Sequence, residues 1–515
     1  MRLASLDRVE LGSRPTQIGV IDLGSNTARL VVYESTPDAG LRIIAEWKDV
    51  PRLGKGTAAD GSLSEEAMER GLSSLRRFAR SLRSMDVARV VAVATSAVRD
   101  APNGADFLRR VEREIGIATR VLTGEEEARY AFLGVASAFE LKNDLVFDLG
   151  GGSLQIVRVE SGKPVSDRSL PLGALRLTER YLEHDPPKKG ELEELRSHVR
   201  HALREASEIL LPAPRRLFGV GGTIRSLARA AIEITEYPLP QLHGYGITRR
   251  DLEAIGDLLL EMSAARRREV PGISGSRSDV IVAGLVTVRE LLSVTEARQL
   301  IACGTGIREG IALESQGAAL PAPAQVLAYR SVVAAARSFG FSLPHGEEVR
   351  RRAIELFDRL DDRKDSDPES RLALEVAAWM HDVGAVIEPA HHPEHSAYIL
   401  RNSRILGLTH REVLLASIAA SLHEGAEPPA RWHKEFRPLL SEEALGLAGR
   451  LGAVLFFAET LSGTGASFSV RSGPKGAIVV SGHRGAQEPV APKALSRLDR
   501  VFQRTWSRKV ESDVG

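Results

Sequence analysis

The stretch at residues 19–32 reads GVIDLGSNTARLVV, in which an apolar run enters a short polar turn and a second apolar run leaves it. Glycine and small polar residues favour tight turns, so turn chemistry alone accounts for this composition. The composition has a second property, because the backbone N–H groups of a glycine-containing turn can converge on an oxyanion. We therefore predict that the turn binds phosphate and that its leading acid, Asp22, binds a metal ion. The predicted phosphate ligands are Gly24, Ser25, Asn26 and Thr27.

The same pattern recurs at residues 144–160, which read DLVFDLGGGSLQIVRVE. Asp148 follows Asp22 by 126 residues, a length that suits one α/β lobe, so the pattern predicts an internal duplication. If the two turns face each other across a cleft, they hold one phosphoryl group from both sides. The two carboxylates then lie near the same point, where oxygen ligands suit Mg²⁺. The second turn adds the predicted phosphate ligands Gly150, Gly151, Gly152 and Ser153.

Composition limits the functions open to this chain. Its 515 residues exceed what one core accommodates, so about three or four domains are expected. The net charge of +1 provides no overall field that attracts a polyanion, so any such affinity needs a local cluster of cations. The single cysteine, Cys303, excludes an intrachain disulfide and suits a reducing cytoplasm.

The N-terminal residues and the apolar runs predict neither secretion nor a membrane span. Residues 1–15 lack the apolar core of a secretory signal and are expected to form an irregular leader. The run VLLASIAASL at 413–422 is among the longest apolar runs and falls short of the ~18 residues of a membrane helix. We expect a cytoplasmic protein with no membrane and no nucleic-acid partner.

Strand and helix patterns predict an α/β fold as far as residue 314. Helical spacing over 62–85, with Ser64 as a capping residue, alternates with apolar strand patterns. We predict lobe I over 16–135 and lobe II over 136–314, with a last helix that could return to lobe I. A boundary rich in Ala, Pro and Gly precedes an all-helical domain predicted over 326–510, which includes a hairpin at 467–484.

Seven motifs stand in one order along the chain. They are IDLGSNTARL (21–30), ATSAVRDAPN (94–103), LTGEEEARYAFLGV (122–135), FDLGGGSLQ (147–155), GVGGTIRSLA (219–228), SDVIVAGL (278–285) and GTGIREGI (304–311). In this the chain resembles the exopolyphosphatase/guanosine pentaphosphate phosphohydrolase (Ppx/GppA) family of the sugar kinase–Hsp70–actin superfold. The resemblance runs through roughly residues 17–314 and more weakly to about 465. It implies two actin-like, ribonuclease H-like lobes with an interlobe cleft.

The resemblance also implies roles for particular residues. Glu127, rather than its neighbour Glu126, corresponds to the family's catalytic acid, which would orient and deprotonate a water molecule for in-line attack on the terminal phosphorus. Arg99 follows a predicted strand, where its guanidinium could bind a phosphate. The GVGGT stretch supplies further expected cleft residues, with close helix–strand packing as the alternative explanation. These are Gly221, Gly222 and Thr223.

The chain departs from the family pattern at Gln155. Many family members have a glutamate two residues after the serine of the second turn, and this chain has an amide there. An amide can still bind a phosphate oxygen, a water molecule or Mg²⁺, but it binds the metal more weakly than a carboxylate does. We place Gln155 with Asp22 and Asp148 as metal ligands, and the departure predicts altered metal use, slower turnover or a subfamily that tolerates glutamine at this position.

The C-terminal part resembles a helical HD domain, a fold that often binds metals. His381 and Asp382 lie within an apolar helix pattern at 377–387, and Glu459 stands where such domains usually have Asp. Because the match is partial, we expect this domain to support packing, dimerisation and substrate binding rather than to hold a metal. Further histidines of this part are His345, His391, His392, His395 and His423.

Several functions remain open from the sequence. The leading one is Mg²⁺-assisted removal of terminal phosphate from inorganic polyphosphate by a homodimer, and hydrolysis of guanosine pentaphosphate uses the same cleft. A non-catalytic polyphosphate or alarmone sensor is a further alternative, whereas the Glu-Glu-Ala-Arg motif argues against a kinase. A polyphosphate track could be formed by arginines on the predicted helix at 191–210 and just after it, or these could belong to a solvated surface. They are Arg196, Arg200, Arg204, Arg215 and Arg216.

Overall fold

The computed structural model divides the chain into two compact units. The first comprises residues 1–236 and 242–323, and the second comprises 237–241 and 324–515. The second unit thus takes in a short segment near 240 that the sequence did not predict to belong with the helical domain. The predicted leader lies almost wholly outside the described residues. These are 15–36, 40–56, 61–87, 89–317, 321–360, 368–462, 468–472, 477–482 and 492–513.

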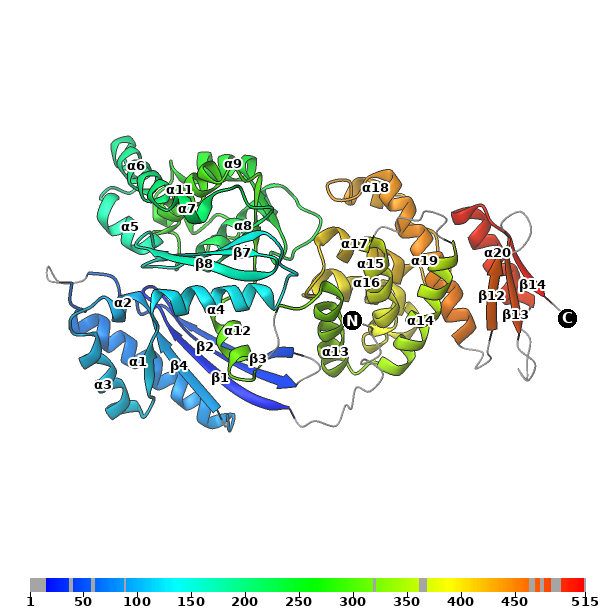
Figure 1. Ribbon diagram of the computed structural model, residues 1–515, viewed down its shortest axis with the longest axis horizontal. Helices are drawn as coiled ribbons and strands as arrows, with labels where there is room; N and C mark the ends of the chain where they lie inside the picture. The colour runs from blue at the N-terminus through cyan, green and yellow to red at the C-terminus, as the bar shows by residue number, and fades with distance from the viewer. Residues whose placement is uncertain are drawn as a thin grey trace. The chain divides into compact units, whose positions relative to one another are not determined.

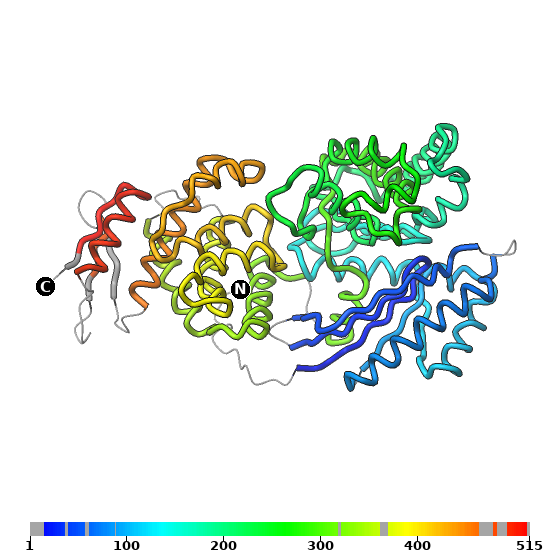
Figure 2. Tube along the Cα trace, turned by 180° about the vertical axis from the view of Figure 1, so that it is seen from behind, coloured from blue at the N-terminus to red at the C-terminus, as the bar shows by residue number. Residues whose placement is uncertain are grey.

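The first sheet of the first unit has five strands in the order β3-β2-β1-β4-β5. The first three strands form an antiparallel meander, and β4 and β5 continue the sheet in parallel with β1. Figure 2 shows the long strands of the meander side by side in dark blue. The strands are β1 (Thr16–Leu23), β2 (Ala28–Thr36), β3 (Gly40–Asp49), β4 (Arg89–Ala94) and β5 (Thr119–Val121).

One face of this sheet is covered by α1 (Glu65–Ser84) and α3 (Gly104–Ile115). The α1 helix begins where the sequence predicts, because the Ser64 hydroxyl accepts a hydrogen bond from the backbone N–H of Ala67 at 3.2 Å. Its apolar stripe, including Leu72 and Phe78, packs on Ile21 and Leu23 of β1. A short helix, α2 (Ser96–Arg99), follows β4.

The opposite face is covered by α4 (Gly124–Ala136) and by the last helix of the unit, α12 (Ile307–Glu314). Because strand side chains alternate between faces, Ile18 and Val20 of β1 point to this side, where they pack with Tyr130 of α4 and Ile311 of α12. Asp22 lies two residues beyond Val20 on the same strand, so its side chain points to the same face as those of Ile18 and Val20. Its carboxylate therefore emerges on the side of the sheet that α4 and α12 cover.

The second sheet repeats the arrangement of the first. Its order is β10-β11-β9-β6-β7-β8, in which β6, β7 and β8 form an antiparallel meander and β9 runs parallel to β6. This equivalence of topology is what the predicted duplication requires. The strands are β6 (Asp144–Leu149), β7 (Leu154–Glu160), β8 (Lys163–Leu170), β9 (Leu217–Val220), β10 (Gly246–Thr248) and β11 (Gln299–Ala302).

Helices of the second lobe lie on one side of this sheet, and α4 contacts its other side, so that α4 lies between the two sheets (Figure 1). Asp148 occupies the penultimate position of β6, as Asp22 does of β1. The helices are α5 (Ala174–Tyr181), α6 (Lys189–Glu205), α7 (Ser207–Leu210), α8 (Gly222–Ile234), α9 (Arg249–Leu259), α10 (Ala264–Arg267) and α11 (Ile281–Val294).

The helices α4 and α12 approach each other so closely that side chains are excluded between them. A Cβ atom on Gly134 would lie 2.1 Å from the carbonyl oxygen of Gly306, and one on Gly310 would lie 2.2 Å from that of Tyr130. Both distances are shorter than any non-bonded contact, so glycine is required at both positions. This contact matters for function because α4 carries Glu127 and α12 carries Arg308.

The second unit is a helical bundle with a small sheet. Its helices are α13 (Ala324–Phe339), α14 (Leu343–Leu360), α15 (Pro368–Met380), η1 (Val383–Val386), η2 (Pro389–His391), α16 (His392–Asn402), α17 (His410–Ser421), α18 (Trp432–Glu435), α19 (Glu442–Ser462) and α20 (Pro492–Trp506). The predicted hairpin is formed by β12 (Phe468–Ser472) and β13 (Ile478–Gly482), which pair antiparallel. The prediction is incomplete, because β14 (Val510–Asp513) adds a third strand that pairs in parallel with β13. Local patterns do not reveal this pairing, since α20 separates the paired strands.

The expectation about apolar runs also needs correction. The helix α19 contains an 18-residue window with a mean hydropathy of 1.4, so its length and composition suffice to cross a membrane. Two-thirds of that window (67%) is buried within the protein. A buried core helix also reaches this length and hydropathy without crossing a membrane. Length and composition are therefore weak evidence for a membrane span here.

Candidate active site

The two predicted turns have the same internal hydrogen bond and meet across the lobes. The Gly24 N–H donates to the Thr27 carbonyl at 3.0 Å, and the Gly150 N–H donates to the Ser153 carbonyl at 3.0 Å. A Cβ atom on Gly151 of the second turn would lie 3.2 Å from the backbone nitrogen of Asn26 in the first turn. The spatial prediction made from the sequence, that both turns face one gap, thus agrees with their placement.

Most of the predicted ligands line one cavity of about 100 Å³. Asp22 and Asp148 reach it from the two sheets, and Glu127 reaches it from α4. The other predicted residues in its lining are Gly24, Ser25, Asn26, Thr27, Gly150, Gly151, Ser153, Gln155, Gly221 and Gly222.

Of the described residues, three predicted ligands stand outside that lining. Gly152 instead provides the close contact between turns, facing Ser25 and Ser96, whose hydroxyl oxygens are 2.9 Å apart. Thr223 is fully buried and its methyl group packs against Gly284 of α11, which supports the alternative of close helix packing at this position. Arg99 lies behind Glu127 rather than in the cavity.

Glu127 is held in place by Arg99. The guanidinium of Arg99 forms an ion pair with the Glu127 carboxylate, and the same nitrogen, Nη1, donates to the carbonyl of Leu122 at 2.8 Å. Burial raises the pKa of Glu127 to about 7; Arg99 opposes this rise, and the negative charges of Asp148 and Asp22 add to it. A carboxylate with this pKa can exchange a proton near neutral pH.

The neighbouring acid, Glu126, has a structural role. Its side chain accepts from the Thr123 N–H at 2.9 Å, while the Thr123 hydroxyl accepts from the Glu126 N–H at 3.1 Å. The two residues thus form a capping box at the start of α4 and satisfy donors that the helix leaves unpaired. This cap orients the first turn so that the next residue, Glu127, faces the cavity.

The two aspartates differ in their surroundings. Asp22 lies 3.2 Å from the Arg308 guanidinium. Asp148 is buried, and burial followed by repulsion from Asp22 raises the pKa of Asp148 to about 6. Asp148 is thus a buried carboxylate with a like charge close by, while the arginines of the cavity partly offset the rise in its pKa.

Four arginines that are not among the predicted site residues also line the cavity. The pKa of Arg225 falls to about 9 and that of Arg277 to about 10, chiefly because they are buried and secondly because neighbouring arginines repel them. Arginines crowded in this way favour a bound anion that carries several negative charges. Three of the four lie inside the motifs quoted above, and that position was the available signal. The four are Arg29, Arg225, Arg277 and Arg308.

Gln155 faces Asp148 across the β6–β7 pair, in the position that Arg29 occupies opposite Asp22. Its Nε2 donates to the hydroxyls of Ser153 at 2.7 Å and Ser169 at 3.2 Å. These bonds orient the amide through its nitrogen, so its carbonyl oxygen remains a possible ligand. Two carboxylates and an amide oxygen form an all-oxygen donor set, which fits a hard divalent cation such as Mg²⁺.

The predicted arginine track is largely occupied by structural ion pairs. Arg196 and Arg200 of α6 pair with the buried Glu290 of α11, at 3.2 and 2.8 Å. Arg216 pairs with the buried Asp144 at 2.8 Å. Since these three cations already neutralise buried acids, they fix helices and a strand end instead of offering free charge to a polyanion.

The fold and the site define the class of protein. Two related α/β lobes, each with a glycine-containing turn directed into a shared cleft, form the actin-like fold. Among solved structures, the Aquifex aeolicus member of the Ppx/GppA protein family is similar at 31% identity and a TM-score of 0.51, covering 59% of this chain and 98% of that one. An exopolyphosphatase from Cytophaga hutchinsonii is similar at 27% identity and a TM-score of 0.55, covering 59% and 99%.

Sequence comparison gives the family. The model of the Ppx/GppA phosphatase family matches residues 31–318, and the model of Ppx/GppA phosphatase domain III matches residues 328–438. Exopolyphosphatase 1 of Mycobacterium tuberculosis is 32% identical over 313 residues, which cover 59% of this chain and 91% of the relative. The chain belongs to the Ppx/GppA phosphatase family.

Proposed function

We propose that this protein hydrolyses the terminal phosphoanhydride bond of inorganic polyphosphate. The observation that carries the proposal is the cavity in which both turns, two aspartates, four arginines and the buried Glu127 meet. Such a site neutralises the charges of a phosphoryl group and leaves one carboxylate positioned to act on water.

In the proposed reaction, the oxygen of a water molecule attacks the terminal phosphorus in line with the bond that breaks. Glu127 takes the proton of this water, orthophosphate is released, and the shortened chain leaves with the bridging oxygen. A pKa near the working pH suits a general base, and Glu127 has such a pKa. Arg99 acts through Glu127 as a positioning residue, since it contacts that carboxylate and not the cavity.

We propose Mg²⁺ as the metal of this site. Asp22, Asp148 and the carbonyl oxygen of Gln155 would hold it, and when bound it would supply positive charge beside the phosphate oxygens. Burial and, secondly, repulsion from Asp22 raise the pKa of Asp148, and a cation between the two carboxylates would relieve that repulsion, which supports this assignment.

Polyphosphate is preferred over guanosine pentaphosphate because relatives that span this chain's first unit carry the name exopolyphosphatase. The cavity of about 100 Å³ suits the terminal phosphoryl group of either substrate. Guanosine pentaphosphate presents the same terminal group and is therefore the first competitor to test.

The experiment is release of orthophosphate from long-chain polyphosphate, guanosine pentaphosphate and ATP, with Mg²⁺ and with chelator. We expect the largest kcat/KM for polyphosphate, and loss of activity with chelator. Glu127→Gln should lower kcat by about 10²–10⁴, the usual contribution of a general base. Faster turnover of guanosine pentaphosphate would contradict the substrate assignment.

The matched control is Glu125→Gln, an exposed acid of the same helical turn that does not line the cavity. We expect it to retain the wild-type rate. A Glu127→Gln enzyme with the wild-type rate would exclude the proposed mechanism, whichever substrate is preferred.

A further inference from the structure

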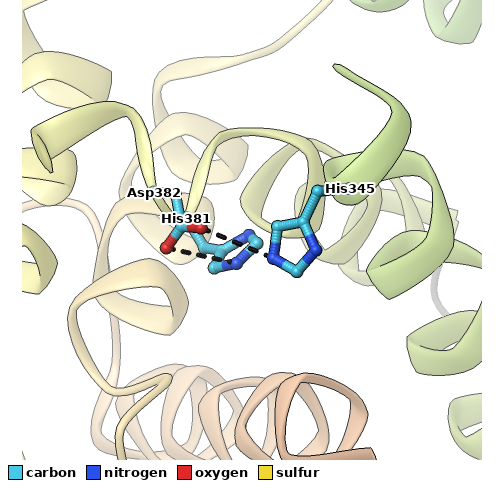
Figure 3. Close-up of side chains that lie close together, drawn as sticks. All are labelled: His345, His381 and Asp382. Carbon is cyan, nitrogen blue, oxygen red and sulfur yellow. Dashed lines mark ion pairs between the residues drawn. The ribbon is translucent and has the colours of Figure 1, made fainter. Parts of the chain in front are cut away.

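Histidines and acids from five helical segments of the second unit meet at one place. His345 comes from α14, and His381 and Asp382 directly follow α15. Figure 3 shows these three side chains directed toward one another. The cluster is completed by His392 at the start of α16, His423 after α17, and Glu459 of α19.

The first half of the cluster surrounds His381. Its Nε2 lies 3.3 Å from Asp382 Oδ1 and 3.1 Å from Glu459 Oε2. The Nε2 of His345 lies 3.4 Å from Asp382 Oδ2 and 3.2 Å from Glu459 Oε2. Two imidazoles and two carboxylates thus present their ligand atoms to the same small space.

The second half shares Asp382. Its Oδ1 lies 3.2 Å from His392 Nε2 and 3.8 Å from His423 Nε2, and these two nitrogens are 2.9 Å apart. Ligands bound at about 2.1 Å to one ion are separated by about 3.0–3.4 Å in octahedral or tetrahedral geometry. Nearly all the distances in the cluster fall close to that range.

The histidines are oriented by their other ring nitrogens. In three of the histidines, Nδ1 lies within hydrogen-bonding distance of a main-chain carbonyl oxygen. The Nδ1 of His381 is 2.8 Å from the Ala378 oxygen, that of His392 is 2.8 Å from the Pro389 oxygen, and that of His423 is 2.5 Å from the Ala420 oxygen. A neutral imidazole that donates from Nδ1 carries its lone pair on Nε2. Such second contacts are what fix histidine ligands around a metal ion.

Two buried atoms of the cluster are left without hydrogen bonds. His381 is fully buried, and among the described residues its Nε2 and the Oε2 of Glu459 have no hydrogen-bond partner of acceptable geometry. A buried polar atom without a well-formed hydrogen bond destabilises the fold. An ion bound between these atoms would remove that penalty for both.

We propose that this cluster is a binding site for a divalent transition-metal ion, with Asp382 as the shared ligand. Imidazole nitrogen suits Zn²⁺, Fe²⁺ and Ni²⁺, whereas Mg²⁺ prefers oxygen, so the site differs in selectivity from the cleft of the first unit. It is buried at His381 and partly exposed at His345, Asp382 and Glu459. A partly exposed site leaves a coordination position for water, as catalytic metal sites do.

This proposal replaces the expectation, drawn from the partial sequence match, that the helical domain holds no metal. It also separates the histidines of the C-terminal part into two groups. His391 and His395 lie near Glu388, at 2.9 and 4.0 Å, and are not members of the metal-ligating groups found among the described residues. They serve as matched controls.

The test is metal content of the full chain after removal of metals by chelator, incubation with Mn²⁺, Fe²⁺, Co²⁺, Ni²⁺ or Zn²⁺, and desalting. We expect about one or two ions per chain for at least one of these metals, and visible absorption bands of nitrogen-ligated Co²⁺. Asp382→Ala and His345→Ala should each lower the metal content or affinity by about tenfold or more. His345 is partly exposed, so its variant keeps the test valid if Asp382→Ala fails to fold.

Two controls separate this site from other binding. His391→Ala should retain the ion, since His391 pairs with Glu388 instead. Asp148→Asn in the cleft of the first unit should also retain it. Wild-type protein that holds no more transition metal than His345→Ala and Asp382→Ala would overturn the proposal.

Discussion

Arg99 and Glu127 form an ion pair in which the guanidinium group of Arg99 also donates to the Leu122 carbonyl at 2.8 Å. The main chain therefore anchors the arginine, and the arginine fixes the direction of the carboxylate. Glu127 is thereby presented to the cavity with a pKa raised to about 7 by burial. We therefore expect Arg99 to influence catalysis by changing the pKa of Glu127.

The pH dependence of kcat/KM should show this ionisation. Glu127 is active as the carboxylate, so activity should fall as pH drops through about 7. Arg99 lowers the pKa of Glu127, so Arg99→Gln should move this acid limb to higher pH and lower the rate at pH 7. The measurement is kcat/KM for polyphosphate from pH 5 to 9. An acid limb that stays in place in Arg99→Gln would mean that the pair does not control the base.

The crowded arginines should make the protein respond strongly to anions. Burial and neighbouring arginines lower the pKa of Arg225, which means that its charge is unfavourable in the unliganded fold. Arg225→Gln should therefore keep or raise the melting temperature without ligand, while the rise caused by tripolyphosphate becomes smaller. Thermal unfolding with and without tripolyphosphate measures both effects. A drop in unliganded stability with an unchanged ligand response would contradict this account.

Gln155→Glu should strengthen metal binding. The substitution places a third carboxylate opposite Asp148 on the paired strand, and carboxylates bind Mg²⁺ more tightly than amides. We expect the Mg²⁺ concentration for half-maximal activity to fall about tenfold, which corresponds to about 1.4 kcal/mol. Ser169→Ala is the control, because it removes one hydrogen bond from Gln155 without adding charge. An unchanged or higher Mg²⁺ requirement in Gln155→Glu would place the metal elsewhere.

Gly310→Ala should damage both stability and the site. The added methyl group would lie 2.2 Å from the Tyr130 carbonyl oxygen, so α12 would have to move away from α4. Overpacking of this kind costs about 1–3 kcal/mol, and the shift would separate Arg308 from Asp22. Urea unfolding and KM for polyphosphate report the two effects. Gly190→Ala on α6, where a Cβ meets no atom within 4 Å, should leave both unchanged.

Much of the fold was predictable because it rests on local patterns. Turn chemistry at Asp22 and Asp148, the alternation of strand side chains, and the cap at Ser64 each involve residues close along the chain. Motif order added the actin-like fold, and the structural similarity to the Aquifex aeolicus and Cytophaga hutchinsonii proteins confirms it. The third strand of the small sheet escaped prediction, because β14 pairs with β13 only after α20 intervenes.

The site was predicted in its residue types more than in its contacts. The sequence predicted that Arg99 binds phosphate, whereas in the structure its guanidinium group pairs with Glu127. Its motif position at 304–311 was the only sequence signal for Arg308, and α12 brings this arginine beside Asp22, 286 residues away along the chain. Partial resemblance argued against a metal in the helical unit, whereas the packing of its helices gathers His345, His381 and Glu459 within 3.2 Å contacts.

By itself, the amino-acid sequence determined the duplicated lobes, the two glycine-containing turns and the acids that lead them, because backbone hydrogen bonding and strand periodicity act over a few residues. Tertiary structure alone decided the protonation behaviour of Glu127 and Asp148, the partners of the arginines, and the convergence of histidines from separate helices. These depend on burial and on charges brought together from distant parts of the chain, and both come into being only when the layers pack.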